Sequence, residues 1–179
     1  MRKIVLTFGL IAGVIMSAMM VITFQFHDEI GFGTEGAIVG YTSMVLAFLM
    51  IYFGVRSYRD NVADGRVSFG RAFTVGLLIM LVASSCYVAT WEVIYYKFAP
   101  DFTDKYATYE LDQARKSGAS DAELASKAAE MAKFKAMYQN PLVNIAFTFL
   151  EPLPVGIVFT LVTAGVLSRK RRPEGPATA

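Results

Sequence analysis

The sequence contains only one cysteine and one histidine, and these scarcities exclude most kinds of site chemistry. A single cysteine, Cys86, cannot form a disulfide within the chain, and one cysteine with one histidine cannot complete a structural zinc site. His27 is the only imidazole, and the sequence offers no set of nucleophile, base and acid around it. We therefore expect no metal, no cofactor and no enzymatic activity.

Charge is also scarce, and it is unevenly distributed. Only 18% of the residues are charged and 55% are hydrophobic, which favours a membrane protein over a soluble domain. Four apolar runs are each long enough to cross a hydrocarbon core of about 30 Å as a helix. They cover about residues 4–24, 36–55, 72–96 and 141–167. The predicted fold class is all-α: an integral membrane four-helix bundle, one four-span domain over residues 1–172 with a disordered tail at 173–179.

The first run follows Arg2 and Lys3, as the apolar core of a secretory signal peptide would. It is longer than such a core, which has roughly 7–15 residues, and no A-x-A cleavage site follows it. We therefore expect an uncleaved membrane helix.

Lysine and arginine gather at one end of every span. They stand at Arg2 and Lys3, within residues 56–71, and within residues 169–172. The short loop on the opposite side carries Asp28, Glu29 and Glu35 but no lysine or arginine. The positive-inside rule then places both termini in the cytoplasm.

Four arginines form a basic belt at the predicted inner face: Arg56, Arg59, Arg66 and Arg71. Such a belt is typical of residues that anchor a protein to lipid headgroups. Specific binding of an anionic lipid is the alternative.

The loop over residues 97–140 is the only sizeable soluble segment. One helix is predicted to follow Asp101 and to end near Gly118, which suits a helix C-terminus. A second helix is predicted from Ser120, because Ser120 and Glu123 have the spacing of a capping box. We expect a helical hairpin packed on the outer ends of the spans, with a ligand-binding or partner-binding cap as the alternative.

Small residues recur along one face of each span. They are Gly9, Gly13 and Ser17; Gly36 and Gly40; Gly76, Ala83 and Thr90; and Gly156, Thr160 and Ala164. Small side chains let helices approach closely in lipid, where packing drives association. We expect these faces to meet mostly within one chain, while contacts with a second copy or with another membrane protein stay open.

Two short stretches of the outer loop resemble ligand motifs. Residues 31–36, GFGTEG, match G-x-G-x-x-G, but a dinucleotide site needs a strand before the glycines, and here a membrane span precedes them. His27, Asp28 and Glu29 have no second histidine to complete a metal site. The net charge of +2 is too small to indicate nucleic-acid binding.

The fourth span contains an acid and two prolines, Glu151, Pro152 and Pro154. Counting about 20 residues outward from the inner basic residues brings Glu151 to the outer shoulder of the bilayer. The same count brings the other spans to acids at a similar height: Glu92, Asp28, Glu29 and Glu35. We therefore predict an acidic outer rim and a helix break at Pro152 and Pro154, because proline lacks the N–H that continues a helix.

Several longer motifs follow one another along the chain. The inner loop reads YRD at 58–60 and DGRVSFGRAF at 64–73, the outer loop reads GASDAE at 118–123, and the last span reads PVGIVFTLVTAGVLSRK at 154–170. Together with four spans, this order resembles family 4199 of the domains of unknown function, small bacterial membrane proteins, over about residues 3–171. The resemblance implies a bacterial membrane location and four helices, but no activity and no functional residue.

The sequence favours a structural or interaction component of a bacterial inner membrane, with the lipid bilayer as its first partner. The alternative is a subunit of a small transporter or channel that uses the acidic rim. A conduction pathway needs polar residues through the midplane, and the first three spans offer only scattered small polar residues there.

Overall fold

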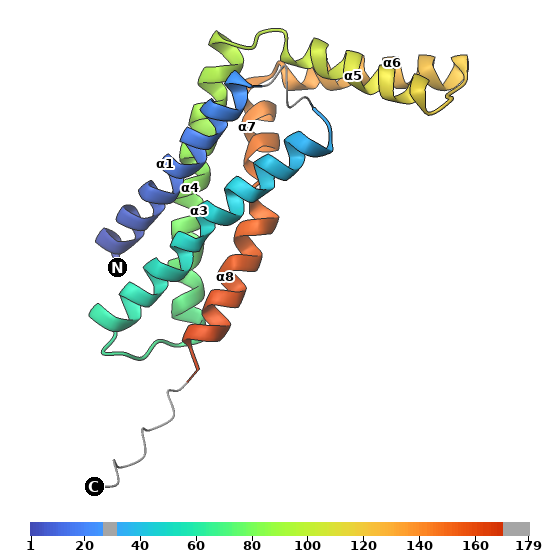
Figure 1. The fold of residues 1–179 in the computed structure, drawn as a ribbon. Helices are drawn as coiled ribbons and strands as arrows, with labels where there is room; N and C mark the ends of the chain where they lie inside the picture. Colours follow the sequence, from blue (N-terminus) through green and yellow to red (C-terminus); the bar gives the residue numbers. More distant parts are fainter. Residues whose placement is uncertain (27–31, 170–179) are drawn as a thin grey trace, which may run out of the picture.

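A computed structural model describes residues 1–26 and 32–169, and every regular element in this part of the chain is a helix (Figure 1). The helices are α1 (Arg2–Gln25), α3 (Thr34–Asn61), α4 (Phe69–Lys97), α5 (Phe102–Lys116), α6 (Asp121–Tyr138), α7 (Pro141–Leu150) and α8 (Leu153–Leu167). Four stretches are long and apolar enough to cross a membrane: α1, α3, α4, and α7 together with α8. The predicted all-α class and the four spans are therefore confirmed. The tail at 173–179 lies outside the described residues.

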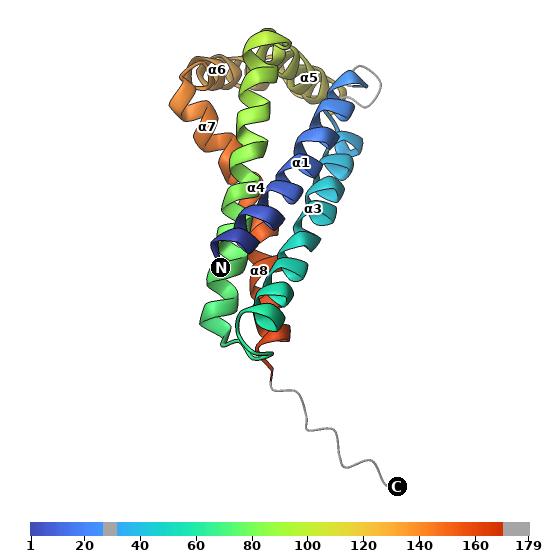
Figure 2. The same ribbon diagram turned by 90° about the vertical axis from the view of Figure 1, so that its left-hand side faces the viewer.

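The four spans form one bundle (Figures 1 and 2). α1 packs along both α3 and α4, and α8 packs against the same two helices from the other side. α7 follows a different course, because it packs against α4 and α6 and has no comparable packing with α3. We call the half of the bundle that contains α8 the inner half and the half that contains α7 the outer half, after the predicted orientation. The four spans pack together in the inner half, whereas α3 and α7 are not packed together in the outer half.

The inner half has a close-packed core. Phe48, Ile51 and Val55 of α3 and Ile79 and Met80 of α4 are almost completely buried. None of these five side chains carries a strong hydrogen-bonding group, so they fill the interior by apolar packing. The hydroxyl oxygen of Thr160 in α8 is also buried there and has no hydrogen-bond partner among the described residues. The inner half is therefore a close-packed base of the bundle.

Glycines allow the helices of this base to approach one another. A Cβ atom added to Gly13 of α1 would lie 2.6 Å from Cβ of Cys86 in α4, and one added to Gly156 of α8 would lie 2.4 Å from the sulfur of Met80. Neither distance is compatible with a real side-chain contact. The small-residue faces of these helices thus meet within one chain, as the sequence predicts.

α5 and α6 form a helical hairpin that projects sideways from the outer end of the bundle (Figure 1). Gly118 adopts a left-handed conformation with φ of 82° after α5, and the capping box of Ser120 and Glu123 starts α6. Both features follow the sequence prediction. The predicted position over the outer ends of the spans is correct only for the base of the hairpin, since α6 reaches the bundle where it meets α7.

Substitution of Gly13 by alanine tests the close approach of α1 and α4. The new Cβ would meet Cys86, so we expect Gly13→Ala to lower the free energy of unfolding by about 1–3 kcal/mol, the usual cost of overpacking a core. The measurement is reversible unfolding in mixed micelles. Gly165→Ala is the control, because a Cβ at Gly165 meets nothing within 4 Å. Equal stability of Gly13→Ala and the wild type would contradict the packing described here.

Candidate membrane-embedded site

The fourth span is interrupted where its acid and prolines stand. α7 ends at Leu150 and α8 begins at Leu153, with Glu151 and Pro152 in a turn between them. Pro152 is the N-cap of α8 and Pro154 lies in its first turn, so the predicted helix break is present at these two prolines. Both prolines lack the N–H that would continue the hydrogen bonding of α7. The interruption lets α7 leave the direction of α8 (Figure 1).

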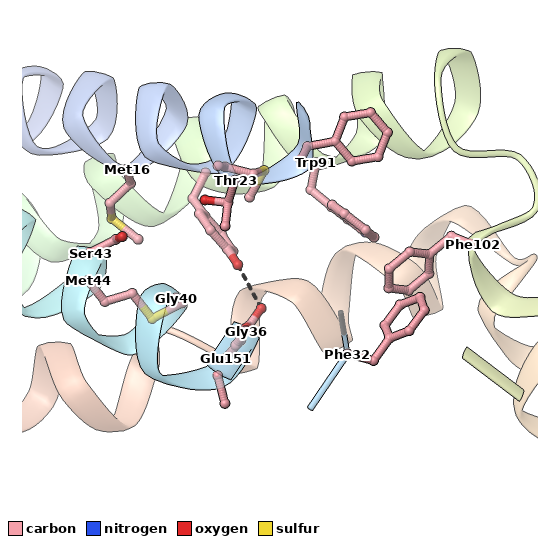
Figure 3. A pocket seen from close by; sticks show the side chains of 14 residues that line it. Met16, Thr23, Phe32, Gly36, Gly40, Ser43, Met44, Trp91, Phe102 and Glu151 are labelled. Carbon is pink, nitrogen blue, oxygen red and sulfur yellow. Dashed lines mark hydrogen bonds between the residues drawn. The ribbon is translucent and has the colours of Figure 1, made fainter. Parts of the chain in front are cut away.

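A cavity of about 320 Å³ lies in the outer half of the bundle, beside this interruption (Figure 3). α1 contributes Met16 and Met20 to its wall, and α3 contributes a glycine-containing segment over residues 36–44. α4 contributes Tyr87 and Trp91. No residue of α7 is among the described lining residues, which agrees with the lack of packing between α3 and α7.

Glu151 lines the cavity and is the only charged residue among its described lining residues. Its Oε2 atom accepts a hydrogen bond of 2.8 Å from the hydroxyl of Tyr87 (Figure 3). No ion pair joins Glu151 to a basic residue among residues 1–26 and 32–169. The carboxyl group thus faces an apolar space with a single neutral partner.

Two hydroxyl groups that line the cavity are bonded to their own helices. The hydroxyl of Thr23 donates to the carbonyl oxygen of Met19, and that of Ser43 donates to the carbonyl oxygen of Val39 at 2.7 Å. Such bonds satisfy hydroxyl groups of membrane helices locally. Glu151 and Tyr87 are therefore the groups left to interact with a molecule in the cavity.

Aromatic rings cover the outer end of the cavity. Phe32, which precedes α3, lies 5.4 Å from the ring centre of Phe102 at the start of α5, and Phe102 lies 4.8 Å from Trp91 with an edge-to-face orientation. Phe32 also contacts the rings of Tyr106 and Tyr109 in α5. These contacts tie the base of the hairpin to the roof of the cavity.

A second set of side chains joins the hairpin to α4 and α7. The Nε1–H of Trp91 donates to the hydroxyl of Tyr138 at 2.9 Å, and Tyr138 also has a side-chain hydrogen bond with Thr148. Thr148 in turn donates to Oδ1 of Asn144 at 3.2 Å. Burial raises the pKa of the Tyr138 hydroxyl, which keeps it neutral. The hairpin, the cavity roof and α7 are thereby connected through Tyr138.

The predicted acidic rim does not come together as one cluster in the described part of the chain. Glu151 enters the cavity, whereas Glu92 of α4 is not among its lining residues, although Glu92 Oε1 is buried with no hydrogen-bond partner among the described residues. Glu35 is exposed at the start of α3. Asp28 and Glu29, with His27, lie outside the described residues.

Three of the four arginines of the predicted inner face have a polar neighbour. Arg56 and Arg59 of α3 approach Asp60 at 3.6 and 2.7 Å, and Arg71 of α4 donates to the hydroxyl of Tyr58 at 3.4 Å. Arg66 is exposed in the loop between the two helices. Anchoring of these four residues to lipid headgroups, or specific binding of an anionic lipid, stays a prediction.

Sequence analysis did not identify Tyr87 as part of the site. Tyr87 and Trp91 stand four residues apart, so they lie on one face of α4, and this spacing was the available signal. Glu151, however, is 64 residues away in the chain. The face of α4 that meets the fourth span depends on how the helices rotate and cross, which the spacing within one helix does not determine.

Comparison with known proteins identifies one family. Residues 7–169 match one family model, which is described as "Protein of unknown function (DUF4199)". The match extends from α1 to the end of α8, and it confirms the resemblance inferred from the motifs. Neither the curated proteins nor the solved structures give a match.

Tyr138→Phe tests the connection between the hairpin and the bundle. The substitution keeps the ring but leaves the Nε1–H of Trp91 without its acceptor, and an unsatisfied buried donor costs about 1–3 kcal/mol. We expect a lower free energy of unfolding and a blue shift in the emission of Trp91, which is the only tryptophan. Tyr96→Phe is the control, because Tyr96 is 46% exposed. Wild-type stability and emission in Tyr138→Phe would exclude the connection.

Proposed function

The chain belongs to the family described as Protein of unknown function (DUF4199), and we propose that it is a non-catalytic interaction component of a bacterial inner membrane. The proposal rests on one observation: the hairpin of α5 and α6 projects sideways from the bundle (Figure 1). Packing of the four spans does not require such a projection. A projecting, well-supported helical surface suits the binding of another protein at the outer face of the membrane.

Interactions along the hairpin support a fixed shape. Lys127 of α6 pairs with Glu110 of α5 at 2.9 Å, and Lys135 of α6 pairs with Asp104 of α5 near the base. The ring of Phe134 lies 6.0 Å from that of Tyr106 across the hairpin. Exposed ion pairs contribute little individually, but here they bridge two helices whose base is already held by aromatic contacts. A preorganised surface loses less entropy on binding than a flexible one.

The charge of the hairpin favours a protein partner over a nucleic acid. Both α5 and α6 contain acidic and basic residues, and several of these are paired with one another. Nucleic-acid binding needs an uncompensated basic face. Mixed charge is instead typical of the polar surfaces through which proteins associate.

A transporter or channel subunit is the second candidate, and the carboxyl group of Glu151 in its cavity favours it. The cavity, however, stops at Met16, Ser43 and Met44. Further inward the core is filled by buried apolar side chains such as Phe48 and Ile79. A single chain with this packing suits the binding of a molecule better than its conduction.

The proposed orientation has both termini in the cytoplasm and the hairpin outside. The support is the basic residues at the end of α3 and in the loop to α4, including Arg56 and Arg66, because positive loops remain on the cytoplasmic side. The hairpin then faces the periplasmic or external side, where a partner would meet it.

One cross-linking experiment tests both the partner and the orientation. A single cysteine is placed at Ala129, which is exposed on α6, in a Cys86→Ala background, and spheroplasts are treated with a membrane-impermeant maleimide carrying a photoreactive group. Val62→Cys in the inner loop, where Val62 is 49% exposed, is the matched control. We expect labelling of Ala129→Cys only, followed by a discrete cross-linked product on illumination.

Two results would contradict the proposal in different ways. Labelling of Val62→Cys in place of Ala129→Cys would reverse the orientation. Labelling of Ala129→Cys without any discrete product, repeated at other exposed positions of α5 and α6, would exclude a partner at the hairpin.

A further inference from the structure

The cavity in the outer half of the bundle contains an acid that has no counter-charge among residues 1–26 and 32–169. Glu151 has Tyr87 as its hydrogen-bond partner, and no lysine, arginine or histidine is among the described lining residues. A charged carboxylate in surroundings this apolar is costly, so the group either takes up a proton or is compensated by a positive charge or several donors. Tyr87 donates its single hydroxyl proton in a hydrogen bond to Oε2 of Glu151. Oε1 of the carboxyl group therefore remains available to another molecule.

The rest of the cavity wall suits an organic cation. Trp91, Phe24, Phe32 and Phe102 line the same cavity as Glu151. Figure 3 shows the rings of Trp91, Phe32 and Phe102 gathered at one end of it. The faces of such rings attract ammonium groups, and aromatic cages are the recurrent way in which proteins hold quaternary ammonium. The methionines at the inner end of the cavity provide an adaptable apolar surface for the remainder of the molecule.

Other occupants fit this wall less well. A metal ion needs several oxygen, nitrogen or sulfur ligands, and Glu151 is the only carboxylate among the lining residues described. An anion would be repelled by that carboxylate. An uncharged apolar molecule would fill the space but would leave the charge unpaired.

We propose that this cavity binds a small organic cation, an ammonium group on an apolar body, with the ammonium between Glu151 and the aromatic roof. The volume of about 320 Å³ is at the lower end of the range for sites that enclose a small molecule. This site is independent of the partner proposed for the hairpin, because none of its contacts involves the outward end of α5 or α6.

The experiment uses the full-length protein in lipid nanodiscs and two probes of nearly the same shape. Benzyltrimethylammonium carries the positive charge, and neopentylbenzene has a carbon atom in place of the nitrogen. Trp91 lines the cavity and is the only tryptophan, so its fluorescence reports binding directly. We expect a saturable change in fluorescence with benzyltrimethylammonium and none with neopentylbenzene.

Two variants test separately whether binding depends on the charge of Glu151 and whether it depends on the open volume of the cavity. Glu151→Gln keeps an oxygen that accepts the Tyr87 hydrogen bond but removes the charge, and we expect binding at least tenfold weaker. Gly40→Phe places a ring in the cavity, since Gly40 lines it and a Cβ there meets nothing within 4 Å. We expect this variant to lose binding. Gly165→Phe is its matched control on α8, again with open space around the Cβ, and it should bind as the wild type does.

Circular dichroism and size-exclusion chromatography establish that each variant is folded. Equal affinity of Glu151→Gln and the wild type would overturn the proposal, and so would equal binding of the two probes, which would assign the cavity to an uncharged apolar molecule. Absence of any saturable change in the folded wild type would overturn it as well. None of these results bears on cross-linking at Ala129, so the two proposals fail separately.

Discussion

The course of the fourth span depends on Pro152 and Pro154, because neither residue has a backbone N–H group. In an unbroken helix, the N–H groups at positions 152 and 154 would bond to the carbonyl oxygens of Thr148 and Leu150, and proline removes both bonds. Inside a bilayer, a missing backbone bond must be compensated by neighbouring groups, so a proline break is stable only where the surrounding structure supports it. Here α7 is held by α4 and α6 in place of α3.

The two halves of the bundle differ because of this break. α8 completes a solid base with α3 and α4, in which glycines such as Gly156 let the helices come close together. Above the break, α7 diverges from α3, and the cavity with Glu151 on its wall lies beside the break. The same divergence brings α7 beneath α6, where Tyr138 joins the hairpin to the bundle. The cavity and the base of the projecting hairpin are therefore both in contact with the interrupted span.

Much of the fold could be predicted from sequence because its signals are local. The apolar runs predicted the four spans, and the spacing of Ser120 and Glu123 predicted the start of α6. Pro152 and Pro154 predicted the break in the fourth span. The site could be predicted only in part. Glu151 was found from its unusual place in an apolar run, but its partner Tyr87 and the enclosing rings come from other helices, and their meeting depends on helix rotation and crossing. The direction of the hairpin was missed for the same reason, since the capping signals within α6 carry no information about where its far end points.

The most direct test of this account is the distance between α3 and α7. Ile38 and Leu142 are 61% and 77% exposed, so each can be replaced by a spin-labelled cysteine in a Cys86→Ala background. Pulsed electron paramagnetic resonance then measures the distance between the two labels. If the prolines hold α7 away from α3, the double substitution Pro152→Ala and Pro154→Ala should straighten the span along α8, which lies against α3, and shift the distance distribution to shorter values. An unchanged distribution in the double variant would show that the prolines do not set the course of α7.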